Sequence, residues 1–198
     1  NQNLLIVEGN LEKENNNFKN SGIQTHAESL KESLSYYTND LNVDVFNPCS
    51  EKSFDRILPN LEKYDGLIWG GSSLNIYNDC IEIRRQISFM KECFKKIKKI
   101  LSICWGMQVA VTAAGGEVKK ATNGAHIGIA NNIEINEDGL KHPLYKSKNK
   151  KYMPSVYLLS CLRSFFRNFS QGLVKHMAKF IQRQSSIKFS AVHDEGGR

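Results

Sequence analysis

The sequence has no apolar run of about 18 residues, the length that a membrane-spanning helix needs. It also has no charged-then-apolar leader of the kind that directs secretion. Its five cysteines are odd in number and lack the paired spacing of metal ligands. Because free thiols persist in reducing compartments, we expect a cytoplasmic protein with no membrane partner, no disulfide framework, no metal site and no cofactor.

Acidic residues are missing from residues 152–192. Residues 1–150 carry 19 Lys and Arg against 18 Asp and Glu, a net charge of +1, whereas residues 151–198 carry 8 against 2, a net charge of +6. The overall charge of +7 therefore belongs almost wholly to the tail. Since nucleic-acid binding requires a basic face interleaved with aromatic side chains, we expect no nucleic-acid partner.

The remaining pattern alternates short apolar runs with segments of helical periodicity, which predicts a parallel sheet with helices on both faces. At 198 residues the chain suits a single domain. Residues 8–20 are polar and predict a loop. Strands are expected at residues 4–7, 43–46, 67–69, 97–103 and, as one or two strands, 127–135; helices are expected at 25–37, 54–61 (weakly, because of Pro59), 83–94 and 108–114.

Cys104 lies between the expected strand at 97–103 and the expected helix at 108–114. A residue at such a turn projects from the carboxyl edge of a parallel sheet, where ligands collect. The first amides and the positive end of the following helix favour a thiolate, the reactive form of cysteine. Gly106 leaves room for a substrate to approach. The alternative interpretation is that Cys104 is a small buried core residue.

Acyl transfer by a cysteine also requires amides that stabilise an oxyanion. Gly70, Gly71 and Ser72 follow the expected strand at 67–69, and their backbone N–H groups are not obstructed by large side chains. The N–H of Trp105, directly after the cysteine, is the other natural donor. A Gly-Gly pair alone is equally typical of a plain turn.

Four blocks of the sequence resemble the class I, or triad, glutamine amidotransferases over roughly residues 3–152. They are residues 64–72 (YDGLIWGGS), 103–108 (ICWGMQ), 114–118 (AGGEV) and 124–129 (GAHIGI). The resemblance is strongest to the stand-alone group that is similar to the amidotransferase part of GMP synthase. It implies a flavodoxin-like, doubly wound α/β fold.

The resemblance also implies a reaction. Cys104 attacks the side-chain amide of glutamine, the Gly71 and Trp105 amides hold the tetrahedral oxyanion, ammonia leaves, and water releases glutamate from a γ-glutamyl thioester. The chain is too short for an added synthetase domain, so ammonia passes to a separate synthetase subunit, or the protein works alone as a γ-glutamyl hydrolase. The resemblance places Gly70, Ser72, Gly106 and Gln108 beside the substrate.

The resemblance largely ends after Tyr152, and with it the family's His-Pro-Glu motif. Residues 189–195 (FSAVHDE) are a remnant in which His193 and Glu195 stand for the catalytic base and its orienting acid; the alternative is a frayed end with an incidental histidine. His176 is a weaker candidate. We hypothesise that residues 153–198 are an atypical tail, altered or frame-shifted relative to a normal amidotransferase tail.

The sequence thus favours a glutamine amidotransferase that hydrolyses glutamine or a related γ-glutamyl amide. A γ-glutamyl peptidase or a DJ-1-like cysteine hydrolase is the alternative enzyme. A third possibility is a regulatory homologue that has lost its base and its activity.

Overall fold

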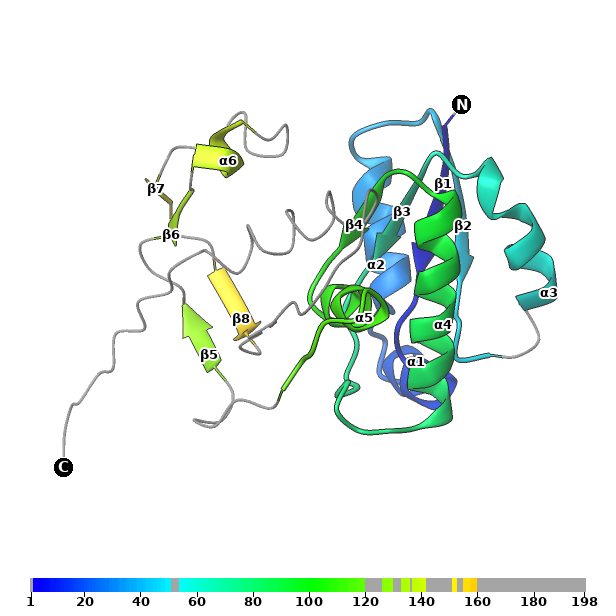
Figure 1. Ribbon diagram of the computed structural model, residues 1–198, viewed down its shortest axis with the longest axis horizontal. Helices are drawn as coiled ribbons and strands as arrows, with labels where there is room; N and C mark the ends of the chain where they lie inside the picture. Colours follow the sequence, from blue (N-terminus) through cyan, green and yellow to red (C-terminus); the bar gives the residue numbers. More distant parts are fainter. Residues whose placement is uncertain are drawn as a thin grey trace. The chain divides into compact units, whose positions relative to one another are not determined.

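The computed structural model (Figure 1) describes residues 2–50, 54–119, 126–129, 133–135, 137–141, 151–152 and 155–159. The chain divides into two compact units, Asn1–Val118 and Lys119–Arg198. Within the described ranges, every helix is too short or too polar to cross a membrane.

The first unit is built on a parallel sheet with the strand order β2-β1-β3-β4. The strands are β1 (Gln2–Val7), β2 (Leu41–Phe46), β3 (Gly66–Trp69) and β4 (Ile100–Ser102). The chain moves from β1 to one side and then back across to β3 and β4. Because such crossovers are right-handed, the reversal places the connecting helices on opposite faces. This confirms the doubly wound, flavodoxin-like α/β architecture.

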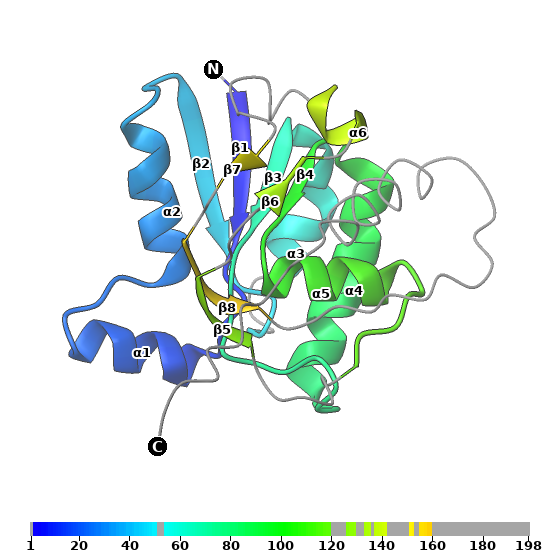
Figure 2. The ribbon, with the colours of Figure 1, turned by 90° about the vertical axis from the view of Figure 1, so that its left-hand side faces the viewer.

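The helices α2 (His26–Ser35) and α4 (Ile81–Lys96) cover the two faces, and Figure 2 shows α2 to the left of the strands and α4 to their right. A capping box starts α2: the Thr25 hydroxyl accepts from the Glu28 N–H, and the Glu28 carboxylate accepts from the Thr25 N–H. The helix α5 (Trp105–Ala113) packs against α4. One face of α4 is buried through Ile83, Gln86, Phe89, Met90 and Cys93.

Three expectations about the elements need correction. Residues 8–20 are not all loop, because α1 (Glu12–Asn20) occupies most of them; it buries no residue, so its sequence carries no apolar stripe. The strand expected at 97–103 is limited to β4 (Ile100–Ser102), because Ile97 is the C-cap residue of α4. The segment at 54–61 divides into α3 (Phe54–Ile57) and the 3-10 helix η2 (Leu58–Lys63), with Pro59 in the first turn of η2.

The described part of the second unit contains short antiparallel pairs. Strand β5 (His126–Ile129) pairs with β8 (Ser155–Leu159), and β6 (Ile133–Glu134) pairs with β7 (Lys151–Tyr152). A short helix, α6 (Glu137–Leu140), follows β6. The strands expected within 127–135 are therefore confirmed. The proposed boundary of an atypical tail at 153 stays a prediction, since most of that tail lies outside the described residues.

An aromatic cluster joins α4 to the sheet. The Phe89 ring lies 4.6 Å from that of Phe46, 5.8 Å from Phe54 and 6.0 Å from Trp69, measured between centroids. Phe89 and Trp69 are both buried. The cluster thus joins α4 to the last residues of β2 and β3, and Trp69 directly precedes the loop at Gly70.

We expect Phe89→Ala to lower the free energy of unfolding by about 3–5 kcal/mol, because it removes the centre of this cluster and leaves a cavity. Chemical denaturation followed by circular dichroism measures the loss. Tyr37→Ala is the matched control: its side chain is 88% exposed, so the change should stay below about 0.5 kcal/mol. Equal losses in the two variants would contradict this assignment of the core.

Candidate active site

Cys104 lies at the turn between β4 and α5 with φ 52° and ψ −102°. It is the one non-glycine residue with positive φ in the described part of the chain. A side chain in this region costs about 1–3 kcal/mol, so the surrounding contacts must hold it there. Cys104 is exposed, which excludes the alternative of a sealed core cysteine.

Hydrogen bonds to the end of β3 hold this turn. The Ile103 N–H donates to the Trp69 carbonyl at 2.8 Å, and the Gly106 N–H donates to the Gly70 carbonyl at 3.1 Å. Inside α5, the Gln108 N–H donates to the Cys104 carbonyl at 3.2 Å. The turn at Cys104 is thus hydrogen-bonded, on both sides of this residue, to the end of β3 and to Gly70.

Gly106 is needed for close packing. A Cβ on this buried residue would lie 2.4 Å from the Trp69 carbonyl oxygen and 2.8 Å from the Trp69 Cβ. The first turn of α5 can approach β3 only because position 106 has no side chain. The structure therefore gives a packing reason for this glycine in place of the open space for substrate that the sequence suggested, and a contact of Gly106 with substrate stays a prediction.

The glycine loop presents a backbone donor. A trans peptide directs its C=O and N–H to opposite sides. Since the Gly70 carbonyl points to the Gly106 N–H, the Gly71 N–H of the same peptide points away from α5's backbone. No hydrogen bond among the described residues uses this N–H. The oxyanion role that the sequence analysis gave to Gly71 stays a prediction.

Trp105 contributes through both its backbone and its ring. Its backbone N–H lowers the pKa of the adjacent Cys104 thiol. The ring is buried, and its Nε1–H donates to Gln86 Oε1 at 2.7 Å. It fills the space beside Gly9, where an added Cβ would meet the ring at 2.6 Å. Gln86 therefore fixes the residue whose amide lies beside the thiol.

A buried polar network continues from Gln86 to the glycine loop. Gln86 Nε2 donates to the Gly9 carbonyl at 3.0 Å, and the Ser72 hydroxyl is also 3.0 Å from that oxygen. Asn10 Oδ1 accepts from the Ser73 N–H at 2.8 Å and lies 3.0 Å from Ser72 Oγ. The Ser72 hydroxyl thus faces the loop after β1, and its contact with substrate stays a prediction.

The sequence analysis missed Glu8, Asn10 and Gln86. Two signals were present: Glu8 and Asn10 directly follow the first strand, at the edge where ligands collect in such sheets, and Gln86 is a polar residue on an otherwise apolar helix face. A buried polar side chain must be hydrogen-bonded, but the sequence cannot identify its partner.

Burial raises the pKa of the Cys104 thiol, and the Trp105 N–H opposes this shift. Although the residue as a whole is exposed, the loss of water around its sulfur outweighs this one amide. The stabilisation of a thiolate by the turn stays a prediction. Burial also raises the pKa of Cys49 to about 12 and raises that of Cys93. Cys104 differs from these two in its exposure and its backbone geometry.

Several other predictions and features can now be placed. Gln108 is buried in α5. His193, Glu195 and His176 lie outside the described residues, so their roles stay predictions.

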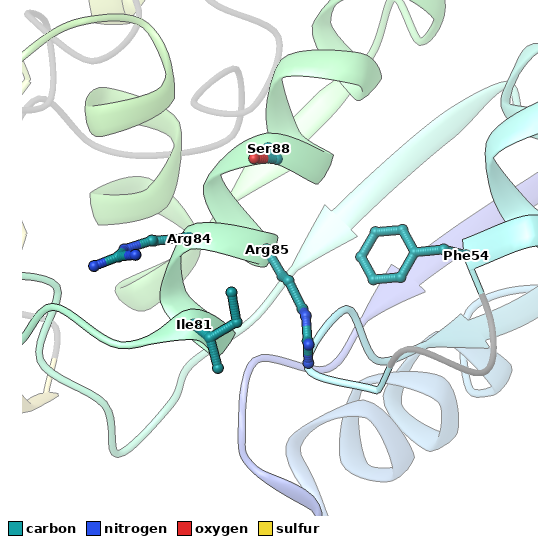
Figure 3. Close-up of a pocket in the computed structure, with 5 residues that line it drawn as sticks. All are labelled: Phe54, Ile81, Arg84, Arg85 and Ser88. Carbon is teal, nitrogen blue, oxygen red and sulfur yellow. The ribbon is translucent and has the colours of Figure 1, made fainter.

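Within the described ranges, no three His, Cys, Asp or Glu side chains gather as metal ligands. A shallow pocket outside the Cys104 turn is lined by α3 and α4 residues (Figure 3): Phe54, Ile81, Arg84, Arg85 and Ser88.

Comparison with known proteins decides the family. The model of the class-I glutamine amidotransferases matches residues 22–191. The chain belongs to this family. A γ-glutamyl-L-1-hydroxyisopropylamide hydrolase from a Pseudomonas species is 30% identical over 152 residues, which are 75% of this chain and 51% of that protein.

Two plant relatives are also similar. Gamma-glutamyl peptidase 2 of Arabidopsis thaliana is 37% identical over 104 residues, 52% of this chain and 40% of that protein. Gamma-glutamyl peptidase 4 is 33% identical over 78 residues, 39% of this chain and 31% of that protein. The chain thus spans about half, or less, of the length of these relatives. They point to γ-glutamyl hydrolases and peptidases rather than to the GMP-synthase-like group, which corrects the finer part of the resemblance.

We expect Gln86→Leu to destabilise the protein, because the buried Trp105 Nε1–H loses its partner and the Gly9 carbonyl keeps only the Ser72 hydroxyl. Each buried group left unpaired costs about 1–3 kcal/mol. Gln24→Leu, the same change at an exposed glutamine, should alter the unfolding free energy by less than about 0.5 kcal/mol. Urea denaturation of both variants measures the difference, and a Gln86→Leu protein as stable as the control would contradict the role given to Gln86.

Proposed function

We propose that this chain is a cysteine hydrolase that cleaves γ-glutamyl amides, with Cys104 as the nucleophile. The observation that carries the proposal is the strained, exposed position of Cys104 in a turn that is hydrogen-bonded to the end of β3 and to Gly70; we assign the oxyanion donors to the N–H groups of Gly71 and Trp105. A residue is held at such cost only where packing and hydrogen bonds over-determine it, and such strain clusters at active sites.

The proposed reaction has two steps. The Cys104 sulfur attacks the δ-carbonyl carbon of the γ-glutamyl group, and the carbonyl oxygen becomes an oxyanion held by the Gly71 and Trp105 N–H groups. The C–N bond then breaks, and the amine leaves with a proton, giving a γ-glutamyl thioester. Water attacks the thioester, glutamate departs, and the proton returns to the thiol.

The reaction requires a base, because burial raises the thiol pKa and the thiolate is the attacking species. We propose His193 as this base and Glu195 as the acid that orients it, on the strength of their order in residues 189–195. The neutral thiol that the described surroundings favour is a suitable resting state for proton transfer to an imidazole.

The relatives favour an amide with an organic leaving group over free glutamine. The Pseudomonas relative is named for hydrolysis of a γ-glutamyl hydroxyalkylamide, and the plant relatives are named as γ-glutamyl peptidases. We therefore place γ-glutamyl alkylamides and γ-glutamyl peptides first as substrates. Ammonia transfer from glutamine to a separate synthetase subunit is the second candidate, supported by the family match.

We expect the purified chain to release glutamate from a γ-glutamyl alkylamide faster than from glutamine. Cys104→Ser should lower kcat on the order of 10⁴-fold or more, because nucleophile and base act as one unit. Cys80→Ser, a free cysteine at the start of α4, should retain activity. Glutamate release by both variants alike, or by neither variant nor the unaltered chain, would contradict the proposal and favour an inactive homologue.

The pH dependence of Cys104 alkylation tests the base. In His193→Ala the midpoint should lie above that of the urea-unfolded chain, because burial raises the thiol pKa in the folded protein. In the unaltered chain an imidazolium partner should move the midpoint down. Iodoacetamide labelling, read at the peptide containing Cys104 by mass spectrometry, measures both. Identical midpoints in the two proteins would exclude His193 as the partner of the thiol.

A further inference from the structure

His26 is the first residue of α2 and lies beside the glycine loop. Two contacts fix the start of this helix: the capping box of Thr25 and Glu28, and the buried carboxylate of Glu8, which accepts from the Ala27 N–H at 2.9 Å. The His26 ring also packs against Phe18, with ring centroids 5.9 Å apart. The position of the imidazole is therefore set by the capped start of α2, by Glu8 directly after β1, and by Phe18 of α1.

The His26 ring is hydrogen-bonded to the glycine loop. Its Nδ1 lies 2.8 Å from the Gly71 carbonyl oxygen. Because a carbonyl can only accept, Nδ1 carries the proton, and the neutral ring is the Nδ1–H tautomer. The contact is close enough that a Cβ on Gly71 would lie 3.2 Å from His26 Cε1. Because Gly71 has no side chain, the His26 ring can reach the Gly71 carbonyl.

Two helix ends hold successive peptides of this loop. The carbonyl of Gly70 is held by the Gly106 N–H of α5, and the carbonyl of Gly71 is held by His26 of α2. Each peptide is planar, so fixing the two carbonyls fixes both dihedral angles of Gly71. Without the second bond Gly71 would be less restricted, because glycine has the widest range of backbone conformations and only the contacts of Ser72 and Ser73 with Gly9 and Asn10 would hold the peptide after it.

We propose that His26 is a positioning residue of the active site: its Nδ1–H holds the Gly71 carbonyl in the peptide that follows Gly71. This restricts rotation at Gly71 and supports the Gly106–Gly70 hydrogen bond, which orients the Gly71 N–H toward the oxyanion of the γ-glutamyl substrate. The inference rests on the proposed function. His26 does not touch the reacting atoms and acts through the loop. It extends the active site to α2, an element that lies before the family's glycine and cysteine motifs in the chain.

Three substitutions at His26 distinguish the effect of its hydrogen-bond donor from the effect of its ring packing. His26→Asn places an amide nitrogen near the position of Nδ1, His26→Gln places it nearer that of Nε2, and His26→Phe keeps a ring without a donor. We expect kcat for a γ-glutamyl alkylamide to fall on the order of 10- to 100-fold in His26→Phe and His26→Gln, with KM nearly unchanged, because a misdirected donor affects the transition state. His26→Asn should recover most of kcat.

Unfolding free energies of the three variants control for a purely structural role. If kcat follows stability, or if His26→Asn is no better than His26→Gln, the proposal is overturned. Nitrogen-15 NMR of the imidazole gives a readout that does not depend on activity. A proton on Nδ1 with a bare Nε2 in the neutral ring is expected, and the Nε2–H tautomer overturns the proposal. An unaltered chain that cleaves no γ-glutamyl amide overturns the proposed function, while the NMR result still decides the bond to Gly71.

Discussion

The hydrogen bond from the Gly106 N–H to the Gly70 carbonyl is the contact on which the candidate active site depends. It fixes the peptide that carries the Gly71 N–H, and it holds the first turn of α5 against β3. That approach requires a glycine at 106, because the Trp69 carbonyl fills the space of a side chain. The positive φ of Cys104 follows, since the chain must reverse between β4 and a helix held this close.

A second layer of contacts supports this arrangement from inside the fold. The loop after β1 supplies the Gly9 carbonyl and the Asn10 side chain, which hold Gln86 and the serines after Gly71. Gln86 in turn holds the Trp105 ring. The side chains of Asn10, Gln86 and Trp105 are buried, where an unpaired polar atom is costly. The network therefore has few alternative arrangements, which suits a site that must hold two amide donors still.

The sequence was sufficient for the strands of the parallel sheet and for the turn at Cys104. Apolar runs predicted β1, β2 and β3, and the block at 103–108 placed Cys104 between strand and helix. The sequence did not predict α1, because this helix has no buried face, and it does not determine the thiol pKa, which depends on how much water the fold removes. The hydrogen-bond partners of Gln86 and His26 could not be predicted for another reason. These partners, Trp105 and Gly71, are distant from them in the sequence.

The central claim is that Cys104 carries the γ-glutamyl group during turnover. Rapid acid quenching of the chain with a γ-glutamyl alkylamide, followed by mass spectrometry of the peptide that contains residue 104, tests it most directly. We expect a γ-glutamyl adduct on Cys104 that disappears as substrate is consumed. Turnover with an unmodified Cys104, or with the adduct on another residue, would contradict the assignment of the nucleophile.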